Sequence, residues 1–175
     1  MTTAGAGALT YQDSADVQFT FNGVLTMSLS EGDLTISDLA PGNKKNSNPV
    51  AITVNTNSAY GYGLYATVGN ATYNNTNLTL AGGAGNFTSV ATGTSTATLT
   101  GGQWGYSTDA GATYKGLPLY TATNGAELKT TTGAASNDVT NFLIGAAAGT
   151  NQAQGTYNNV INFAAVAKVA EASGS

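Results

Sequence analysis

The sequence contains no cysteine, no histidine and no arginine among its 175 residues. These absences exclude Ser-His-Asp and Cys-His nucleophilic catalysis, metal sites built on His or Cys, and Arg clamps for phosphate. Disulfide bonds cannot form without cysteine, so packing and hydrogen bonds must hold the fold together. No other catalytic motif stands out. We therefore predict that the protein is not an enzyme and that it holds no cofactor and no metal.

Charge is scarce as well. Only 8% of the residues are charged, against about 25% in a typical globular domain. Five Lys stand against nine acidic residues, which leaves no basic surface for nucleic acid. No apolar run approaches the roughly 18 residues of a membrane-spanning helix, and Met1 is not followed by a basic and then apolar leader. We expect no nucleic-acid partner, no transmembrane segment, and a chain that is a mature form or begins with an added Met.

Threonine, asparagine and glycine supply much of the remaining sequence, with 28, 18 and 23 residues respectively. Threonine favours strands, whereas asparagine and glycine favour turns. Because 41% of the residues are hydrophobic and the net charge is only −4, the composition indicates one folded domain rather than a disordered chain. It predicts an all-β protein with long Gly/Asn/Thr-rich loops.

The clearest pattern in the chain lies in residues 16–30. Large apolar side chains occupy alternate positions and mostly polar ones lie between them, as in a strand whose successive side chains point to opposite faces. At about 3.3 Å per residue, a continuous strand here would be unusually long. We predict one long strand whose apolar face is buried in the core, formed by Val17, Phe19, Phe21, Leu25, Met27 and Leu29.

A competing signal lies inside this stretch, because Asn22-Gly23 is typical of a two-residue hairpin turn. Such a turn would pair Phe21 with Val24 and would place Phe19 on the face opposite to Leu25. A continuous strand keeps all the large apolar residues on one face, so we favour it and expect Gly23 at a bend or bulge. The hairpin remains the alternative.

Alternation and turn signals predict several further strands, at residues 34–36, 50–55, 60–68, 104–106, 139–144 and 156–169. We expect the second and third of these to pair as a hairpin. No amphipathic helix is evident, which favours antiparallel sheets packed face to face. The predicted fold is an antiparallel β-sandwich, Ig-like or jelly-roll-like. Its expected parts are an extended N-terminal arm (residues 1–15), a single domain (residues 16–170) and a C-terminal tail (residues 171–175).

Three groups of segments resemble secreted bacterial surface proteins: residues 36–42 with 52–57 and 61–64, residues 104–107 with 114–118, and residues 155–163. The first has Leu-x-Pro-Gly followed by a polar strand and a Gly-Tyr strand, and the last opens a terminal strand with Gly-Thr-Tyr. These features are similar to those of pilus subunits, WxL-type wall proteins and related sandwiches. The resemblance implies a secreted, surface-exposed sandwich of a kind that often polymerises, and hence an extracellular location.

Aromatic side chains are the candidates for a binding site. Tyr65, Tyr73, Trp104 and Tyr106 could stack on sugar rings of surface glycans. The alternative is that such residues pack in the core, as tyrosines of strands commonly do. For these residues, core packing is the interpretation that we favour.

Other polar residues offer weaker candidates. Two carboxylate pairs, Asp13/Asp16 and Glu31/Asp33, have the chemistry for calcium binding or glycoside hydrolysis, although Glu31-Gly32-Asp33 is more simply a turn. Lys115 or Lys168 could form an intramolecular isopeptide bond with Asn or Asp, but a solvated lysine is the simpler interpretation.

We predict that the chain is a structural subunit of an extracellular filament or pilus. It would assemble head-to-tail into a homopolymer by strand donation, since exposed sheet edges accept strands from other chains. Leu9 and Tyr11 share the parity of Val17 and Phe19, so the arm could extend this alternation inside a neighbouring subunit. The alternatives are a frayed arm and, for the protein, a carbohydrate-binding or adhesive surface module.

Overall fold

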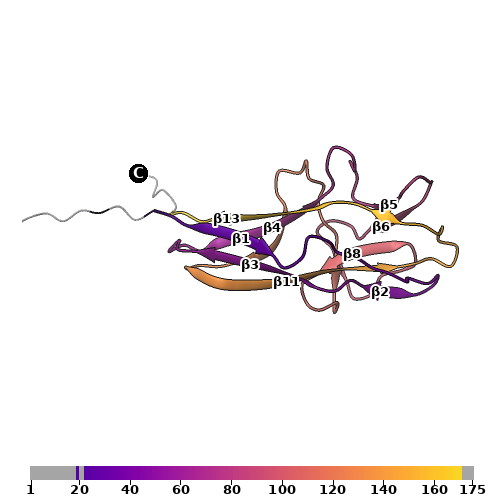
Figure 1. Ribbon diagram of the computed structural model, residues 1–175, viewed down its shortest axis with the longest axis horizontal. Helices are drawn as coiled ribbons and strands as arrows, with labels where there is room; N and C mark the ends of the chain where they lie inside the picture. Colours follow the sequence, from indigo (N-terminus) through magenta and orange to yellow (C-terminus); the bar gives the residue numbers. More distant parts are fainter. Residues whose placement is uncertain (1–18, 20–21, 171–175) are drawn as a thin grey trace, which may run out of the picture.

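The computed structural model describes residue 19 and residues 22–170 of the chain. Within these residues every regular element is a β-strand, and the strands run mainly along the long axis of an elongated molecule (Figure 1). Their bounds are β1 Leu25–Leu29, β2 Lys44–Asn46, β3 Val50–Thr56, β4 Tyr62–Val68, β5 Leu78–Leu80, β6 Asn86–Ser89, β7 Ser95–Thr96, β8 Gln103–Ser107, β9 Tyr114–Lys115, β10 Ala126–Thr130, β11 Ala135–Ala147, β12 Tyr157–Asn158 and β13 Ile161–Ala167. The all-β prediction is confirmed.

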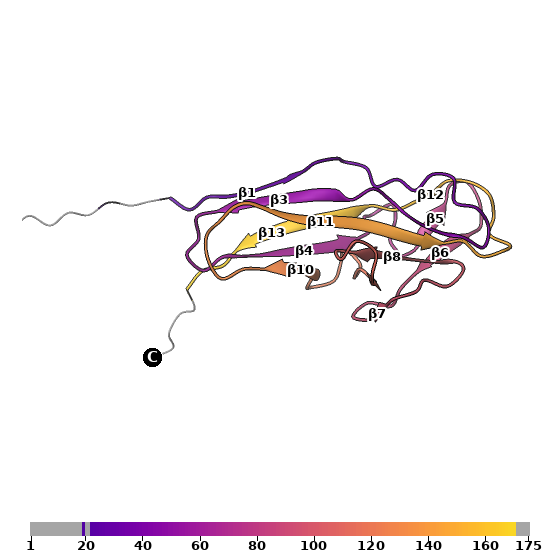
Figure 2. The ribbon, with the colours of Figure 1, turned by 90° about the horizontal axis from the view of Figure 1, so that it is seen from below.

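The strands form two sheets, which are seen edge-on in Figure 2. The larger sheet has ten strands, with the main order β1-β3-β11-β8-β6-β5-β12, while β2, β7 and β9 pair beside this path. The smaller sheet has three strands in the order β10-β4-β13. Most pairs are antiparallel, as predicted; the pair of β6 with β8 is parallel.

The core forms where the inward faces of the two sheets meet. Strand β3 alternates buried Val50, Ile52 and Val54 with half-buried residues, which is the pattern expected for a strand with one covered face. Strand β4 supplies a second such row, with Tyr62, Leu64, Ala66 and Val68 all at 0–1% exposure. These rows, together with side chains from β8 and β11, form one cluster that includes Trp104, Phe142 and Ile144.

The predicted hairpin between residues 50–55 and 60–68 is wrong, although both strands are present. β3 pairs with β1 and β11 in the larger sheet, whereas β4 pairs with β10 and β13 in the smaller one. The connection passes from one sheet to the other through Gly61, whose φ of 81° lies in the left-handed region that favours glycine. Both inward faces are apolar, so each strand can bury its face against the other sheet.

Two further predicted strands differ from the structure. Residues 34–36 form no strand, but Leu34 and Ile36 are half-buried against the core. The predicted last strand is divided into β12 and β13 at Asn159, whose side-chain amide donates to the carbonyl oxygens of Asn75 (3.0 Å) and Asn77 (2.7 Å). These bonds join the break to the loop before β5.

Of the predicted long strand over residues 16–30, the structure describes residue 19 and residues 22–30, and within these only β1 is a strand, which begins at Leu25. Leu25 and Met27 pair with Thr56 and Val54 of β3, so their side chains turn toward the core side of the sheet. They nevertheless remain 36% and 37% exposed, because β1 is an edge strand. Phe19 is 84% exposed, so the prediction that it is buried in the core of its own subunit is wrong. Leu9, Tyr11, Val17 and Phe21, like the predicted arm and tail, lie outside the described residues.

The two phenylalanines Phe142 and Phe19 provide a matched test of the core. The Phe142 ring is fully buried; it stacks on Tyr106 at 5.3 Å and meets Phe163 edge-on at 5.0 Å between centroids. We expect Phe142→Ala to lower the free energy of unfolding by about 3–5 kcal/mol, and Phe19→Ala to change that of the monomer by less than about 0.5 kcal/mol. Urea melts measure both, and equal losses would contradict this assignment of the core.

Candidate functional site

The two ends of the elongated molecule differ in chemistry. We call the end where β1 begins and β13 ends the N-terminal end, and the end that carries β5, β6 and β12 the far end (Figure 1). A small hollow at the N-terminal end is lined by residues 22–25, 56–60 and 167–170, so both ends of the described chain meet there. The candidate site consists of the polar contacts at this end and an open groove toward the other.

Asn57 holds the chain where it enters β1. Its side-chain Oδ1 accepts from the backbone N–H of Val24 (2.7 Å), and its Nδ2 donates to the carbonyl oxygen of Asn22 (2.9 Å). The backbone N–H of Asn57 and the Thr56 hydroxyl also donate to the Val24 carbonyl. An amide side chain has the donor and the acceptor of a peptide group, so Asn57 prolongs the β1–β3 ladder toward residue 22.

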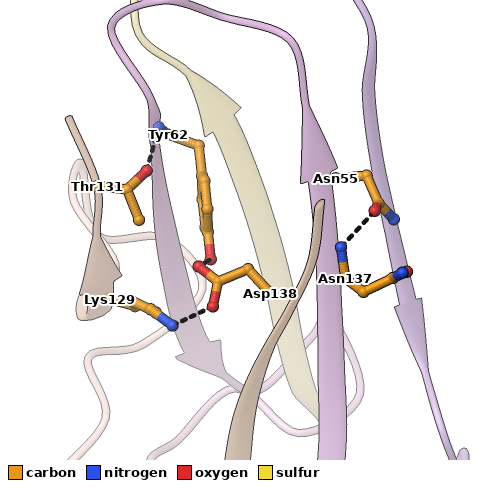
Figure 3. A network of polar contacts seen from close by, with 6 residues as sticks. All are labelled: Asn55, Tyr62, Lys129, Thr131, Asn137 and Asp138. Atoms are coloured by element: carbon orange, nitrogen blue, oxygen red, sulfur yellow. Dashed lines mark hydrogen bonds and ion pairs between the residues drawn. The ribbon is translucent and has the colours of Figure 1, made fainter. Parts of the chain in front are cut away.

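A second polar network joins the two sheets at the N-terminal end (Figure 3). The Tyr62 hydroxyl of β4 donates to Asp138 Oδ2 of β11 at 2.8 Å, and Lys129 of β10 pairs with Asp138 Oδ1. The hydrogen bond from Lys129 lowers the pKa of Asp138. Burial, together with the hydrogen bond to the ionised Asp138, raises the pKa of the Tyr62 hydroxyl. The carboxylate is therefore charged and fully engaged, which suits a cross-sheet tie rather than acid–base chemistry.

The C-terminal end of β13 is fixed to the same region. The Ser58 hydroxyl donates to the Lys168 carbonyl at 2.6 Å, and the Lys168 N–H donates to the Gly61 carbonyl at 2.9 Å. Lys168 Nζ donates to Thr130 Oγ1 (2.5 Å) and to the carbonyl of Thr131 (2.9 Å). This ammonium thus lies against hydroxyl and carbonyl oxygens, which gives no support to an isopeptide bond at Lys168.

Toward the far end, a groove of about 1050 Å³ opens between residues 29–41 and residues 152–163, and we call it the edge groove. Its walls and floor combine apolar and polar side chains in similar measure and come from β1, β3, β5, β6, β11, β12, β13 and the segment after β1. They include Leu29, Leu34, Ile36, Leu39, Val50, Leu78, Phe87, Ile144, Ala146, Tyr157, Ile161 and Phe163. Several of these side chains, among them Leu34, Ile36, Ile161 and Phe163, pack against the core while remaining only half-buried.

Strands β1 and β13 lie on either side of the seam that leads to this groove. Some of their Cα atoms approach within 8 Å, yet β1 pairs only with β3 and β13 only with β4 among the described strands. Each therefore offers one unpaired backbone edge. The chain from residue 31 to residue 41 belongs to no strand, so the wall beside the groove also has backbone groups outside any ladder. Such edges can accept another strand.

The structure corrects part of the predicted aromatic site. Trp104 is fully buried and its indole N–H donates to the Thr76 carbonyl at 3.0 Å, while Tyr106 is 4% exposed. Neither ring presents a face for sugar stacking, and for both residues the core interpretation holds. Tyr65 and Tyr73 are half-buried, on β4 and in the following loop. The structure does not gather these four rings on one open surface.

The structure describes one of the two carboxylate pairs, Glu31 and Asp33. Asp13 and Asp16 lie outside the described residues, and Glu31 and Asp33 lie on the rim of the edge groove. In the described part of the chain, no group of three or more acidic residues is placed to hold a metal ion. None of the described elements is a helix long and apolar enough to cross a membrane.

Comparison of the chain with protein-family models, with curated proteins and with solved structures found no match.

Sequence reasoning missed Asn57, Lys129 and Asp138. Asn57 lies just after a strand that the sequence predicted, but 18 asparagines make no single one conspicuous. Lys129 and Asp138 are nine residues apart on strands of different sheets, and no local pattern predicts their contact. The sequence did not predict the edge groove either, because the groove depends on which strands lie at the edges of the sheets.

The cross-sheet tie predicts a specific acid sensitivity. The pKa of Asp138 is lower in the folded protein than the value of about 3.9 for an unfolded chain. Its stabilising contribution is therefore complete above about pH 4 and is lost as the pH falls through the folded value.

We expect Asp138→Asn to reduce the free energy of unfolding at pH 7 by up to about 1 kcal/mol, since both partners are partly exposed. The variant should lose less stability than the wild type between about pH 5 and pH 2. Denaturant melts over this range measure both effects. The remaining slope should include Asp109, whose pKa is lowered to about 2 by hydrogen bonds from Ser107 and Thr113. Parallel pH curves for the two proteins would refute the assigned role of Asp138.

Proposed function

We propose that this chain is a structural subunit of an extracellular surface filament or pilus, which assembles head-to-tail as a homopolymer by strand donation. Two sheets with a common apolar core are compatible with a β-sandwich, Ig-like or jelly-roll-like, of the kind found in pilus subunits and WxL-type wall proteins. One pairing of features carries the proposal: an open groove with half-buried apolar side chains lies toward the far end, and an apolar, alternating segment precedes β1 in the sequence.

Three further features support assembly. Phe19 is 84% exposed, so the described fold offers it no buried position. Strands β1 and β13 each keep a free edge. The net charge of −4 over 175 residues imposes little repulsion between stacked copies. A contact that joins different surfaces of two copies produces an open filament unless it closes into a ring.

The alternative of a carbohydrate-binding or adhesive module requires several aromatic faces open on one surface. Trp104, Tyr62 and Tyr114 are completely buried, and Tyr106 nearly so. The burial of these rings therefore favours the subunit over the glycan-binding module.

Removing residues 1–21 tests the proposal directly. We expect the truncated chain to keep its β-sheet circular dichroism and to remain monomeric at concentrations where the full chain forms filaments, because the donated strand is gone. Negative-stain electron microscopy and light scattering measure assembly. Removal of residues 171–175 is the control, since that segment, Glu-Ala-Ser-Gly-Ser, has no large apolar side chain and should not affect filaments. Normal filaments from the N-terminally truncated chain would refute strand donation by this segment.

A further inference from the structure

The edge groove and residue 22 lie toward opposite ends of the molecule. Strands β5, β6 and β12, which line part of the groove, are at the far end (Figure 2), whereas residue 22 is held by Asn57 beside the start of β1. We infer that the edge groove is the acceptor site for residues 15–21 of a neighbouring copy of this chain, an inference that rests on the function proposed above. This inference names both surfaces of the contact, whereas strand donation by itself does not say which part of the neighbouring copy accepts the strand.

The sequence of residues 15–21 fits a strand with one buried face. Ala15, Val17, Phe19 and Phe21 fall on one face, and Asp16, Gln18 and Thr20 on the other. Asp13 interrupts the apolar face toward the amino terminus, so the inserted stretch ends near residue 15. The groove contains half-buried apolar side chains, among them Leu34, Ile36 and Phe163, and an apolar strand face laid on them would bury both sets of side chains together.

Charge favours the same stretch. The groove rim carries Glu31, Asp33 and Asp38, and no lysine lines it. Residues 17–21 are uncharged and enter such a rim without repulsion. Asp16 lies on the outward face of the inserted strand, whereas Asp13 falls on the inward face and is disfavoured close to the rim. The rim thereby sets a limit on how far the strand inserts.

The chain cannot use this segment to cover its own β1 through a two-residue turn. Such a hairpin would place Phe19 opposite Thr26 and Phe21 opposite Val24, on the face away from Met27. Met27 is on the core side, since it pairs with Val54. A type I′ turn also needs a positive φ at both central residues, and the φ of Gly23 is not positive. A strand from another copy has no such turn and can insert with its apolar face inward.

Asn57 acts as a positioning residue for the segment. It bonds to Asn22 and Val24 from the β3 side, so the chain before β1 is aligned with the β1–β3 ladder. Residues 22–24 are thereby fixed at the N-terminal end, so a neighbouring copy that receives the residues before them must present its edge groove to this end. This arrangement is head-to-tail.

Cysteine cross-linking tests the contact on the full chain, which has no cysteine of its own. One variant carries Thr20→Cys, on the outward face of the inserted strand. It is mixed during assembly with a second variant carrying Thr35→Cys or Asn158→Cys, one on each groove wall. The control partner carries Glu127→Cys, which is exposed on β10 at the other edge of the smaller sheet. After oxidation, mass spectrometry identifies the linked peptides.

We expect Thr20→Cys to link to one or both groove-wall positions at least tenfold more than to the Glu127 position. Adding Phe19→Ser to the Thr20→Cys chain should abolish the link, whereas adding Gln18→Ser should leave most of it, because residue 19 faces the groove and residue 18 faces away from it. Links at Glu127, or no links within filaments that form normally, would overturn the groove as acceptor. Loss of filaments on removal of residues 1–21 would still support strand donation in that case, so the two proposals can fail separately.

Discussion

A strand that pairs on one side leaves half of its backbone groups without a partner in the sheet, and this constraint applies to both β1 and β13. The two strands belong to different sheets, and they border the same seam. Because neither bonds to the other, the apolar residues behind them are closed off only partly: Leu25, Met27 and Leu29 stay 36–40% exposed. The other strands of the core, β3, β4 and β11, have partners on both sides. The open seam is therefore a local property of the fold rather than a sign of poor packing throughout.

The two ends of the molecule differ in how far their polar groups are hydrogen-bonded to other parts of the chain. At the N-terminal end, Asn57, Asp138 and Lys168 connect β1, β3, β4, β10, β11 and β13 through side-chain hydrogen bonds and one ion pair. Toward the far end, the chain from residue 31 to residue 41 has no strand partner and leaves a hollow of about 1050 Å³. An end at which residues 22–24 are held by side-chain hydrogen bonds and an open groove toward the other end are the two different surfaces that the proposed head-to-tail polymer requires.

The period-2 pattern predicted the elements well where one face is buried and the other is not. β3, β4 and the Trp104–Tyr106 part of β8 agree with the sequence within a few residues, because their alternation comes from burial in the same core. The sheet to which a strand belongs could not be predicted in this way. β3 and β4 are adjacent in sequence and equally apolar on their inward faces, and the choice between hairpin pairing and crossing depends on partners that are distant in sequence, Phe142 and Phe163 among them. The contact between Lys129 and Asp138 could not be predicted for the same reason, since it depends on which sheet each strand belongs to.

Phe19 shows where the sequence argument failed and what the failure implies. The alternation correctly indicated a strand with an apolar face over Leu25–Leu29, but the assumption that the core of the same chain also buries Phe19 was wrong. Within one subunit, the face of Leu25 and Met27 turns toward the core side, while Phe19 is 84% exposed. Alternation with no buried position in its own fold is difficult to explain by stability of the monomer, since an exposed ring contributes little there. The pattern is explained if another copy buries this face. A hairpin onto β1 would turn Phe19 away from the core side, whereas a strand from a separate copy can insert with Phe19 facing inward.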